Sequence, residues 1–261
     1  MSLIKFLLAP TKALNLHMVK KIIFYLKFLS QGTNKYNIHS PMVHDFIENI
    51  LDNSIKYYSF IGIEHVRSLL LKQNKAIKLK DLGAGSKSIK SSRSTINFLA
   101  KKVQSRPEKA QILFRMVSFF QKKNILEIGT SLGLTTAYLS KANKDGKVTT
   151  IEGDPNVFSL AQKNFKTLKL KNIEIINQPF DQIIPQLLKN KFDLIFFDGN
   201  HSKEATLRYF YWLVEHANED SIFIFDDIYW SKEMKQAWEV ICSYDKVMLS
   251  LDIFSFGIVF F

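Results

Sequence analysis

The fold of this chain is decided by residues 125–136, which read Ile125-Leu126-Glu127-Ile128-Gly129-Thr130-Ser131-Leu132-Gly133-Leu134-Thr135-Thr136. The segment begins as a short apolar β-type run, turns at a glycine, and continues as the start of a helix. A glycine at such a turn lets the backbone approach a ligand closely, because it has no side chain. The segment therefore predicts a ligand-binding loop at the carboxyl end of a strand.

Outward from this loop, short apolar runs alternate with helical stretches. The strand candidates are residues 125–128, 148–151, 173–176, 194–197, 222–225, 247–251 and 257–261. Apolar strands that alternate with helices are typical of a parallel sheet covered on both faces. The last two candidates lie about five residues apart, which is too few for a crossover and predicts an antiparallel hairpin. We therefore expect a Rossmann-like, doubly wound α/β fold with seven strands, the last of them antiparallel.

The glycine spacing of the loop limits the ligand. Its pattern is E-x-G-x-x-x-G, and Ser131 stands where dinucleotide-binding enzymes have the second glycine of G-x-G-x-x-G. That glycine lets a pyrophosphate lie against the backbone, so its absence favours an adenosine ligand without a diphosphate. The next strand candidate ends in Glu152, 23 residues beyond Gly129, where a carboxylate can accept hydrogen bonds from both ribose hydroxyls.

On these features, residues from about 110 to 261 resemble the class I S-adenosylmethionine-dependent methyltransferases. The resemblance implies the order of the strands in the sheet, with strands four and five as neighbours. It also implies that the turn residues bind the methionine part of S-adenosylmethionine, with Glu127 near the amino group and Glu152 on the ribose. The implied turn residues are Gly129, Thr130, Ser131 and Gly133. The resemblance further implies that Gln178 and Phe180 flank the adenine, although Phe180 could equally be a core residue.

Three acidic residues follow two of the strand candidates. Asp198 follows strand four, and Asp226 and Asp227 follow strand five. Carboxylates crowded at one sheet edge repel one another unless a cation joins them, and oxygen ligands suit a hard ion such as Mg²⁺. The alternative is that one of the aspartates caps the following helix. The triplet resembles that of metal-dependent O-methyltransferases of the catechol and macrolide-sugar types, which implies Mg²⁺ bound by Asp198, Asp226 and Asp227.

His201 lies three residues after Asp198 and is the predicted catalytic base. Asp198 is itself predicted to belong to both the catalytic site and the cofactor site. A hydroxyl must lose its proton as it attacks the sulfonium methyl group, and imidazole titrates near neutral pH. The resemblance to the sugar-type enzymes implies the same role. A helix-capping or surface histidine is the alternative.

The remaining residues, 1–109, are predicted to form a helical N-terminal extension, with the methyltransferase domain at 110–261. The net charge of +12 comes from the N-terminal side, since residues 1–110 contain 19 Lys and Arg against 6 Asp and Glu. Such a region can bind nucleic acid or an anionic membrane surface, or can simply keep the protein in solution. Residues 5–8 and 19–29 read as basic amphipathic helices, either on a membrane surface or packed on the main domain.

A second glycine loop, Asp81-Leu82-Gly83-Ala84-Gly85, lacks an acid-ending strand after it and is assigned to the substrate side.

The predicted activity is Mg²⁺-assisted methylation of a small-molecule hydroxyl. Two alternatives remain: a methyltransferase acting on RNA or protein through the basic region, and a non-catalytic cofactor-binding or membrane-surface protein. A homodimer is also considered.

The only cysteine, Cys242, excludes an internal disulfide and fits a reducing compartment. We therefore expect a cytoplasmic protein, which would be peripheral at the membrane if the basic helices bind there. The apolar runs are too short to span a membrane.

Overall fold

The computed structural model describes residues 16–32, 39–52, 55–79, 93–102 and 104–261. The chain divides into two compact units, Met1–Asn37 and Ile38–Phe261. In the first unit, helix α1 spans Leu16–Gln31, which contains the predicted helix at 19–29. The second glycine loop at 81–85 and the predicted helix at 5–8 lie outside the described residues. No helix in the described part of the chain has the length and apolar character needed to cross a membrane.

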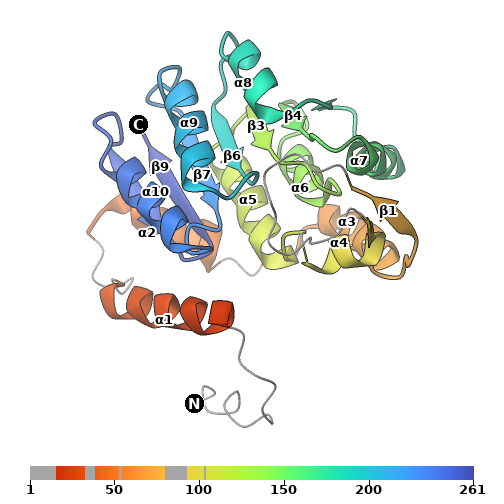
Figure 1. Cartoon of the computed structure of the whole chain (residues 1–261). Helices are drawn as coiled ribbons and strands as arrows, with labels where there is room; N and C mark the ends of the chain where they lie inside the picture. The colour runs from red at the N-terminus through yellow and green to blue at the C-terminus, as the bar shows by residue number, and fades with distance from the viewer. Residues whose placement is uncertain (1–15, 33–38, 53–54, 80–92, 103) are drawn as a thin grey trace. The chain divides into compact units, whose positions relative to one another are not determined.

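A seven-stranded sheet organises the second unit (Figure 1). Its strands are β3 (Asn124–Ile128), β4 (Lys147–Ile151), β5 (Ile173–Ile176), β6 (Leu194–Phe197), β7 (Ile222–Asp226), β8 (Leu249–Asp252) and β9 (Phe256–Phe260). Their order is β5-β4-β3-β6-β7-β9-β8. The first five pair in parallel, whereas β9 pairs antiparallel with both β7 and β8. The predicted fold, the C-terminal hairpin and the pairing of strands four and five are confirmed.

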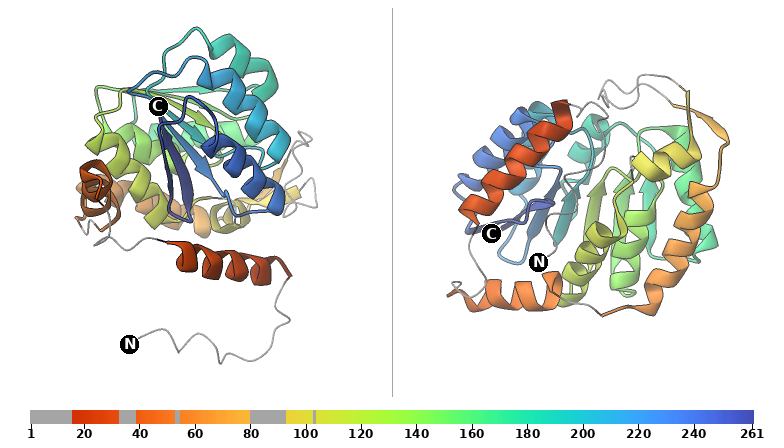
Figure 2. Two further views of the ribbon diagram at one scale, coloured as in Figure 1. Left: turned by 90° about the vertical axis from the view of Figure 1, so that its left-hand side faces the viewer. Right: turned by 90° about the horizontal axis from the view of Figure 1, so that it is seen from below.

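Helices cover both faces of this sheet, as the two views in Figure 2 show. They are α5 (Pro107–Phe119), α6 (Leu134–Ala142), α7 (Pro155–Thr167), α8 (Phe180–Leu187), α9 (Lys203–Val214) and α10 (Lys232–Cys242). Successive strand residues point to opposite faces. Phe196 of β6 packs in one core cluster with Leu113 of α5, whereas Phe225 of β7 contacts Phe210 of α9 and Trp238 of α10. Burial on both sides explains why these strands are almost uniformly apolar.

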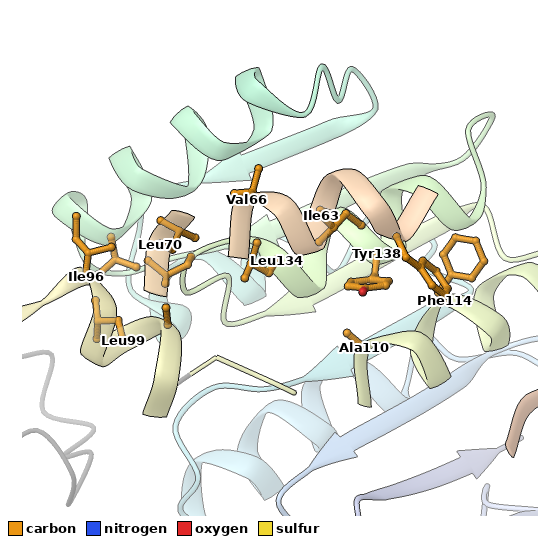
Figure 3. Packing of buried hydrophobic residues seen from close by; sticks show 14 of the residues in the cluster. Ile63, Val66, Leu70, Ile96, Leu99, Ala110, Phe114, Leu134 and Tyr138 are labelled. Carbon is orange, nitrogen blue, oxygen red and sulfur yellow. The ribbon is translucent and has the colours of Figure 1, made fainter. Parts of the chain in front are cut away.

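The N-terminal part of the second unit packs against the start of this sheet domain. It contains α2 (Pro41–Phe46), the π-helix η2 (Ile47–Leu51), α3 (Tyr58–Leu71), β1 (Ala76–Lys78), β2 (Arg93–Thr95) and α4 (Ile96–Lys102). Figure 3 shows Ile63 and Val66 of α3 with Leu134 and Tyr138 of α6 in one buried cluster. These helices belong to one compact unit with the sheet, and the boundary predicted at residues 109 and 110 stays a prediction.

Two local features of this N-terminal part follow from its sequence. Pro41 begins helix α2, where its missing N–H is not needed, and the side chain of Ser40 before it makes no capping hydrogen bond. The segment around Lys78, which makes a poor buried strand by sequence, forms a separate two-stranded antiparallel ribbon of β1 with β2. Only the central residue of β1, Ile77, is buried, which agrees with the alternation of lysine and apolar residues there.

Candidate active site

The loop between β3 and α6 has the backbone conformation that its glycines predict. Gly129 has φ +109° and Gly133 has φ +77°, both in the left-handed region that favours glycine. A Cβ at Gly129 would lie 2.8 Å from the carbonyl carbon of Asp198, and one at Gly133 would lie 2.7 Å from Cζ of Phe165. The turn therefore lies directly against the end of β6. This contact joins the predicted cofactor loop to the predicted acidic site.

Glu127 lies completely buried beneath this loop. Its Oε2 accepts hydrogen bonds from the hydroxyls of Thr136 and, at 2.6 Å, Thr150. Its Oε1 is buried and has no hydrogen-bond partner. Burial raises the pKa of this carboxyl to about 8. An unpartnered buried acceptor costs free energy, and a cationic amino group would satisfy it, which fits the role predicted for Glu127.

Glu152 lies at the carboxyl end of β4, beside the same loop. Its Oε2 accepts a hydrogen bond from the backbone N–H of Ser131 at 2.9 Å, and its Oε1 accepts one from the N–H of Asp154 at 2.9 Å. Burial raises its pKa to about 7, against the opposing effect of these backbone hydrogen bonds. Ser131 itself has φ +50°, an uncommon conformation for a residue with a side chain. The carboxylate thus tethers the strained turn, a contact that the sequence did not reveal.

The other predicted cofactor residues, Thr130, Phe180 and Gln178, lie in different surroundings. The buried hydroxyl of Thr130 lies 2.6 Å from that of Thr150, so this side chain faces the protein interior. Phe180 packs at the end of β6, where a Cβ at Gly199 would lie 2.6 Å from its Cε2, and its ring is T-shaped to that of Tyr209. Gln178 is exposed. The adenine contacts of Gln178 and Phe180 stay predictions.

The three predicted acids meet at the carboxyl ends of β6 and β7. Asp226 is the last residue of β7 and is 4% exposed, while Asp198 and Asp227 are partly buried. Burial, and then the neighbouring Asp226, raise the pKa of Asp198 well above its usual range. Helix α10 is capped by Ser231, whose hydroxyl accepts from the N–H of Met234 at 3.0 Å. Ser231, rather than Asp226 or Asp227, therefore caps that helix.

A lysine that the sequence analysis did not consider enters this acidic cluster. Lys109, on the first turn of α5, donates a short hydrogen bond from Nζ to Oδ1 of Asp226, and the Nζ lies 3.7 Å from Oδ1 of Asp227. Burial lowers the pKa of Lys109, but the carboxylates of Asp226, Asp227 and Asp198 outweigh it, so that the pKa lies above its ordinary value. No local motif marks this residue, because it precedes its partners by more than a hundred positions.

The arrangement does not fit the predicted metal centre. Among the described residues, no group of three or more acidic, histidine or cysteine side chains is arranged to hold a metal ion. The ammonium of Lys109 already bonds Oδ1 of Asp226, one of the carboxylate oxygens in the predicted ligand set. The predicted set of Asp198, Asp226 and Asp227 is therefore brought together as an acidic cluster, but its cation here is a side chain.

His201 follows the end of β6 on the same side of the sheet. Its Nε2 lies 3.6 Å from Oδ1 of Asp198, which is within ion-pair range but long for a hydrogen bond. Helix α9 is capped by Ser202, whose hydroxyl accepts from the N–H of Ala205. His201 is therefore not the cap of α9. It lies beside the acidic cluster, as the prediction of a catalytic base requires.

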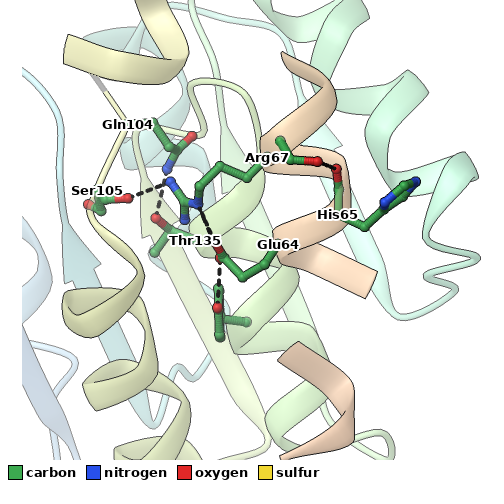
Figure 4. Close-up of polar contacts among 8 residues, drawn as sticks. Glu64, His65, Arg67, Gln104, Ser105 and Thr135 are labelled. Carbon is green, nitrogen blue, oxygen red and sulfur yellow. Dashed lines mark hydrogen bonds and ion pairs between the residues drawn. The ribbon is translucent and has the colours of Figure 1, made fainter. Parts of the chain in front are cut away.

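A buried polar network fixes the segment that leads into α5 (Figure 4). Arg67 of α3 pairs with Glu64, with 2.9 Å between Nε and Oε2, and donates from Nη1 to the carbonyl of Ser105 at 2.8 Å. Next to it, Gln104 donates to the hydroxyl of Thr135, in the first turn of α6, at 3.0 Å. Oε1 of Gln104 is a further buried acceptor without a partner. The network thus connects α3 both to α6, which follows the predicted cofactor loop, and to the start of α5, which carries Lys109.

Two aromatic residues, Tyr229 and Trp230, follow Asp227 closely in the chain. Tyr229 is buried, and its hydroxyl donates to Oδ2 of Asp252 at 2.6 Å while its ring stacks on Phe254. Packing on the β8–β9 hairpin is thus the observed role of Tyr229. Trp230 is partly buried.

Comparison with known proteins agrees with this fold. The protein family described as a methyltransferase domain matches residues 126–228. This match covers less than half of the chain, and the strand order and the β3–α6 loop agree with the fold expected from the resemblance to the class I S-adenosylmethionine-dependent methyltransferases. Two features of this loop are compatible with S-adenosylmethionine. There is no room for a side chain at Gly129, and the buried Oε1 of Glu127 has no hydrogen-bond partner.

Three curated relatives are similar over part of their length. A catechol O-methyltransferase of Niastella koreensis is 31% identical over 127 residues, which are 47% of this chain and 57% of the relative. A catechol O-methyltransferase of Mycobacterium tuberculosis is 27% identical over 123 residues, 46% of this chain and 55% of the relative. A protein-L-isoaspartate O-methyltransferase of Methanococcus maripaludis is 36% identical over 72 residues, 23% of this chain and 34% of the relative. The chain thus spans little more than half of the two catechol O-methyltransferases.

Solved structures share the fold at low identity. Cofactor-bound Rv0187 from MTB has a TM-score of 0.58 at 16% identity and covers 88% of this chain and 98% of its own. The O-methyltransferase from Bacillus cereus in complex with SAH has a TM-score of 0.55 at 17% identity, covering 84% and 97%. At such identities, the likeness concerns the fold alone.

Proposed function

We propose that this protein transfers the methyl group of S-adenosylmethionine to a hydroxyl oxygen of a small molecule. The observation that carries the proposal is the direct contact between the cofactor loop at Gly129 and the end of β6 at Asp198. It sets a donor site and a polar acceptor site side by side at one sheet edge. The names of the two catechol O-methyltransferase relatives support an oxygen acceptor.

In the proposed reaction, an oxygen–carbon bond forms as the carbon–sulfur bond breaks, and the electron pair of that bond stays on sulfur. S-adenosylmethionine supplies the activated methyl group. The hydroxyl proton goes to the imidazole of His201, which lies beside Asp198. The cofactor loop and the acidic cluster contribute mainly by alignment of donor and acceptor.

The Mg²⁺-assisted version of this reaction, predicted from the resemblance, remains a competing proposal. It requires the ammonium of Lys109 to leave Asp226 before a metal can use the same oxygen. Catechol-type and sugar-type acceptors are both considered, because the pair Asp226-Asp227 resembles the sugar type while the curated relatives carry the catechol name.

The experiment is transfer of a radiolabelled methyl group from S-adenosylmethionine to a panel of catechols, simple phenols, glycosides and nucleotides. Binding of S-adenosylhomocysteine is measured in parallel by calorimetry. Glu152→Ala should weaken that binding at least roughly tenfold, because it removes the predicted ribose contacts and the tether of Ser131. Glu174→Ala, an exposed glutamate on the adjacent strand β5, is the matched control. Equal affinity for wild type and Glu152→Ala would reject the assignment of Glu152.

A protein or RNA acceptor is the second candidate. The short match to a protein-L-isoaspartate O-methyltransferase favours testing peptides in the same panel. Label found only in peptide or RNA, and in none of the small molecules, would replace the leading proposal.

We also propose that the first unit binds anionic membrane surfaces. Residues 1–37 contain six lysines and no Asp or Glu. Within α1, Ile22, Ile23, Leu26 and Leu29 are exposed apolar residues, and Lys27 is exposed among them. Helices with an apolar face and basic residues bind the interface of anionic bilayers. A nucleic-acid partner and a homodimer stay predictions.

The full chain should float with vesicles that contain phosphatidylserine and not with pure phosphatidylcholine, and added salt should release it. Leu26→Ser with Leu29→Ser should abolish flotation, whereas Leu71→Ser, an exposed leucine outside α1, should not. Failure to float, or retention on RNA alone, would contradict the membrane proposal.

A further inference from the structure

We infer that Lys109 is the resident cation of the acidic cluster, and that it takes the place of the divalent metal in binding the methyl acceptor. The inference deepens the proposed function, because it concerns how the same site holds its acceptor. It departs from the metal dependence that the resemblance implies. The observations behind it are the contacts of Lys109, the way its helix is fixed, and the number of charges in the cluster.

The first step is the position of the ammonium. Nζ of Lys109 bonds Oδ1 of Asp226 and lies 3.7 Å from Oδ1 of Asp227. The same Oδ1 of Asp226 also accepts the backbone N–H of Asp227 at 2.7 Å. An oxygen that already accepts two donors, one of them cationic, offers little to Mg²⁺, which demands near-ideal octahedral ligands. The ammonium and a metal therefore compete for one place.

The second step is that Lys109 is held in this place. Its side chain is only 21% exposed, and its Nζ lies 5.0 Å from the ring centroid of Phe256, a favourable cation–π arrangement. The neighbouring Ala110 is fully buried in the core, which fixes the rotation of α5. The chain just before the helix is anchored by the hydrogen bond from Arg67 to the carbonyl of Ser105. The lysine is thus part of a packed structure rather than a mobile surface side chain.

The third step is the balance of charge. Without a cation, Asp198, Asp226 and Asp227 would repel one another at partly buried positions. Lys109 and His201 both form ion pairs with carboxylates of this cluster. Removing the basic partner of a largely buried ion pair leaves an uncompensated negative charge, and this charge strongly favours uptake of another cation. Removal of the lysine should therefore create the metal site that the wild type lacks.

A consequence concerns the class of acceptor. A metal ion can hold two vicinal oxygens of a substrate at once, whereas an ammonium is a compact charge that donates separate hydrogen bonds. With Lys109 as the cation, an acceptor with a single hydroxyl should bind about as well as one with two adjacent hydroxyls. Simple phenols and catechols should then differ by less than roughly tenfold in kcat/KM.

The test is a titration of the full chain with Mn²⁺, in which electron paramagnetic resonance measures the concentration of the free ion. Wild type and Lys109→Arg should bind no Mn²⁺ below the millimolar range, whereas Lys109→Ala should bind at least roughly tenfold more tightly. Lys246→Ala, which removes an exposed ion pair with Glu215, is the control and should behave as wild type. Methyl transfer by the wild type should be unchanged by EDTA.

Wild-type binding of Mn²⁺ as tight as that of Lys109→Ala would overturn the inference, and so would loss of methyl transfer in EDTA. The wild-type titration needs no variant, so it decides the matter even if Lys109→Ala does not fold. Failure of the proposed function would look different: the wild type would then bind no S-adenosylhomocysteine, whatever the manganese titration gives.

Discussion

The two halves of the site are built in contrasting ways. The cofactor half consists of one continuous segment, residues 127–133, with Glu152 from the next strand along the chain. The proposed acceptor half gathers Lys109, Asp198 and the pair Asp226-Asp227 from three distant segments. The first half can be recognised as a local pattern, whereas the second exists only after β6, β7 and α5 have come together.

Both halves contain residues with positive φ, but only the cofactor half uses glycine for some of them. The cofactor loop has Gly129 at φ +109° and Gly133 at φ +77°, where glycine carries no steric cost, and also Ser131 at φ +50°. The acceptor half has Asn200 and Asp227 at φ +51°, where a side chain is present. Non-glycine residues in this region cluster at functional sites, and the surrounding packing must hold them there. The comparison suggests that mutation should damage the two halves by different routes.

The largest effect is expected for Gly129→Ala. The new Cβ would lie 2.8 Å from the carbonyl carbon of Asp198, at a φ that disfavours side chains, so the loop must move. We expect the affinity for S-adenosylhomocysteine to fall roughly a hundredfold or more, measured by calorimetry. Gly62→Ala, in α3, is the control, since its Cβ would meet only Leu168 Cδ2 at an ordinary 3.7 Å. Normal affinity of Gly129→Ala would show that the loop does not contact the cofactor.

Asp198→Asn should damage the acceptor half selectively. The substitution removes a charge that neighbours Asp226 and His201 but keeps the shape of the side chain. We expect methyl transfer to fall roughly a hundredfold while the affinity for S-adenosylhomocysteine stays within about twofold. A parallel loss of cofactor affinity would show that the two halves are not separable at this residue.

Glu127→Gln should change how the free energy of unfolding depends on pH. A carboxyl whose pKa is raised to about 8 in the folded protein contributes stability at low pH that is lost as the pH rises from its unfolded value of 4.5 through 8. Relative to Glu127→Gln, the wild type should therefore lose up to a few kcal/mol between pH 5 and pH 9. Urea unfolding of both proteins at the two pH values checks this. A difference that does not change with pH would mean that Glu127 is not buried as described.

The smallest effect is expected for His201→Ala. The imidazole lies 3.6 Å from Asp198 and is not a helix cap, so its loss should affect proton transfer more than folding. Methyl transfer should fall roughly tenfold near pH 7 and recover toward wild type at higher pH, where the hydroxyl ionises without a base. A pH–rate profile checks this, with His216→Ala as the control. Wild-type rates at pH 7 would remove His201 from the mechanism.

Much of the fold followed from local patterns. All seven strand candidates were confirmed in the main sheet. In the central strands β6 and β7, burial on both faces leaves a run of apolar residues that the sequence displays directly, whereas the edge strands β5 and β8 are only partly buried. The contact between Glu152 and Ser131 could not be read in the same way, since it depends on the distance between two strand ends. The unexpected ion pair of Lys109 has the same origin, because α5 precedes β3 in the chain but packs so that its first turn reaches the end of β7.

By itself, the sequence determined the alternation of strands and helices, the glycine turn at Gly129, and the presence of three aspartates after β6 and β7. These features are fixed by backbone sterics and by burial, which act over a few neighbouring residues. Only the tertiary structure decided which cation faces those aspartates. That choice depends on the packing of α5 against the sheet, because a lysine becomes the counter-ion of Asp226 only when the fold brings its ammonium there.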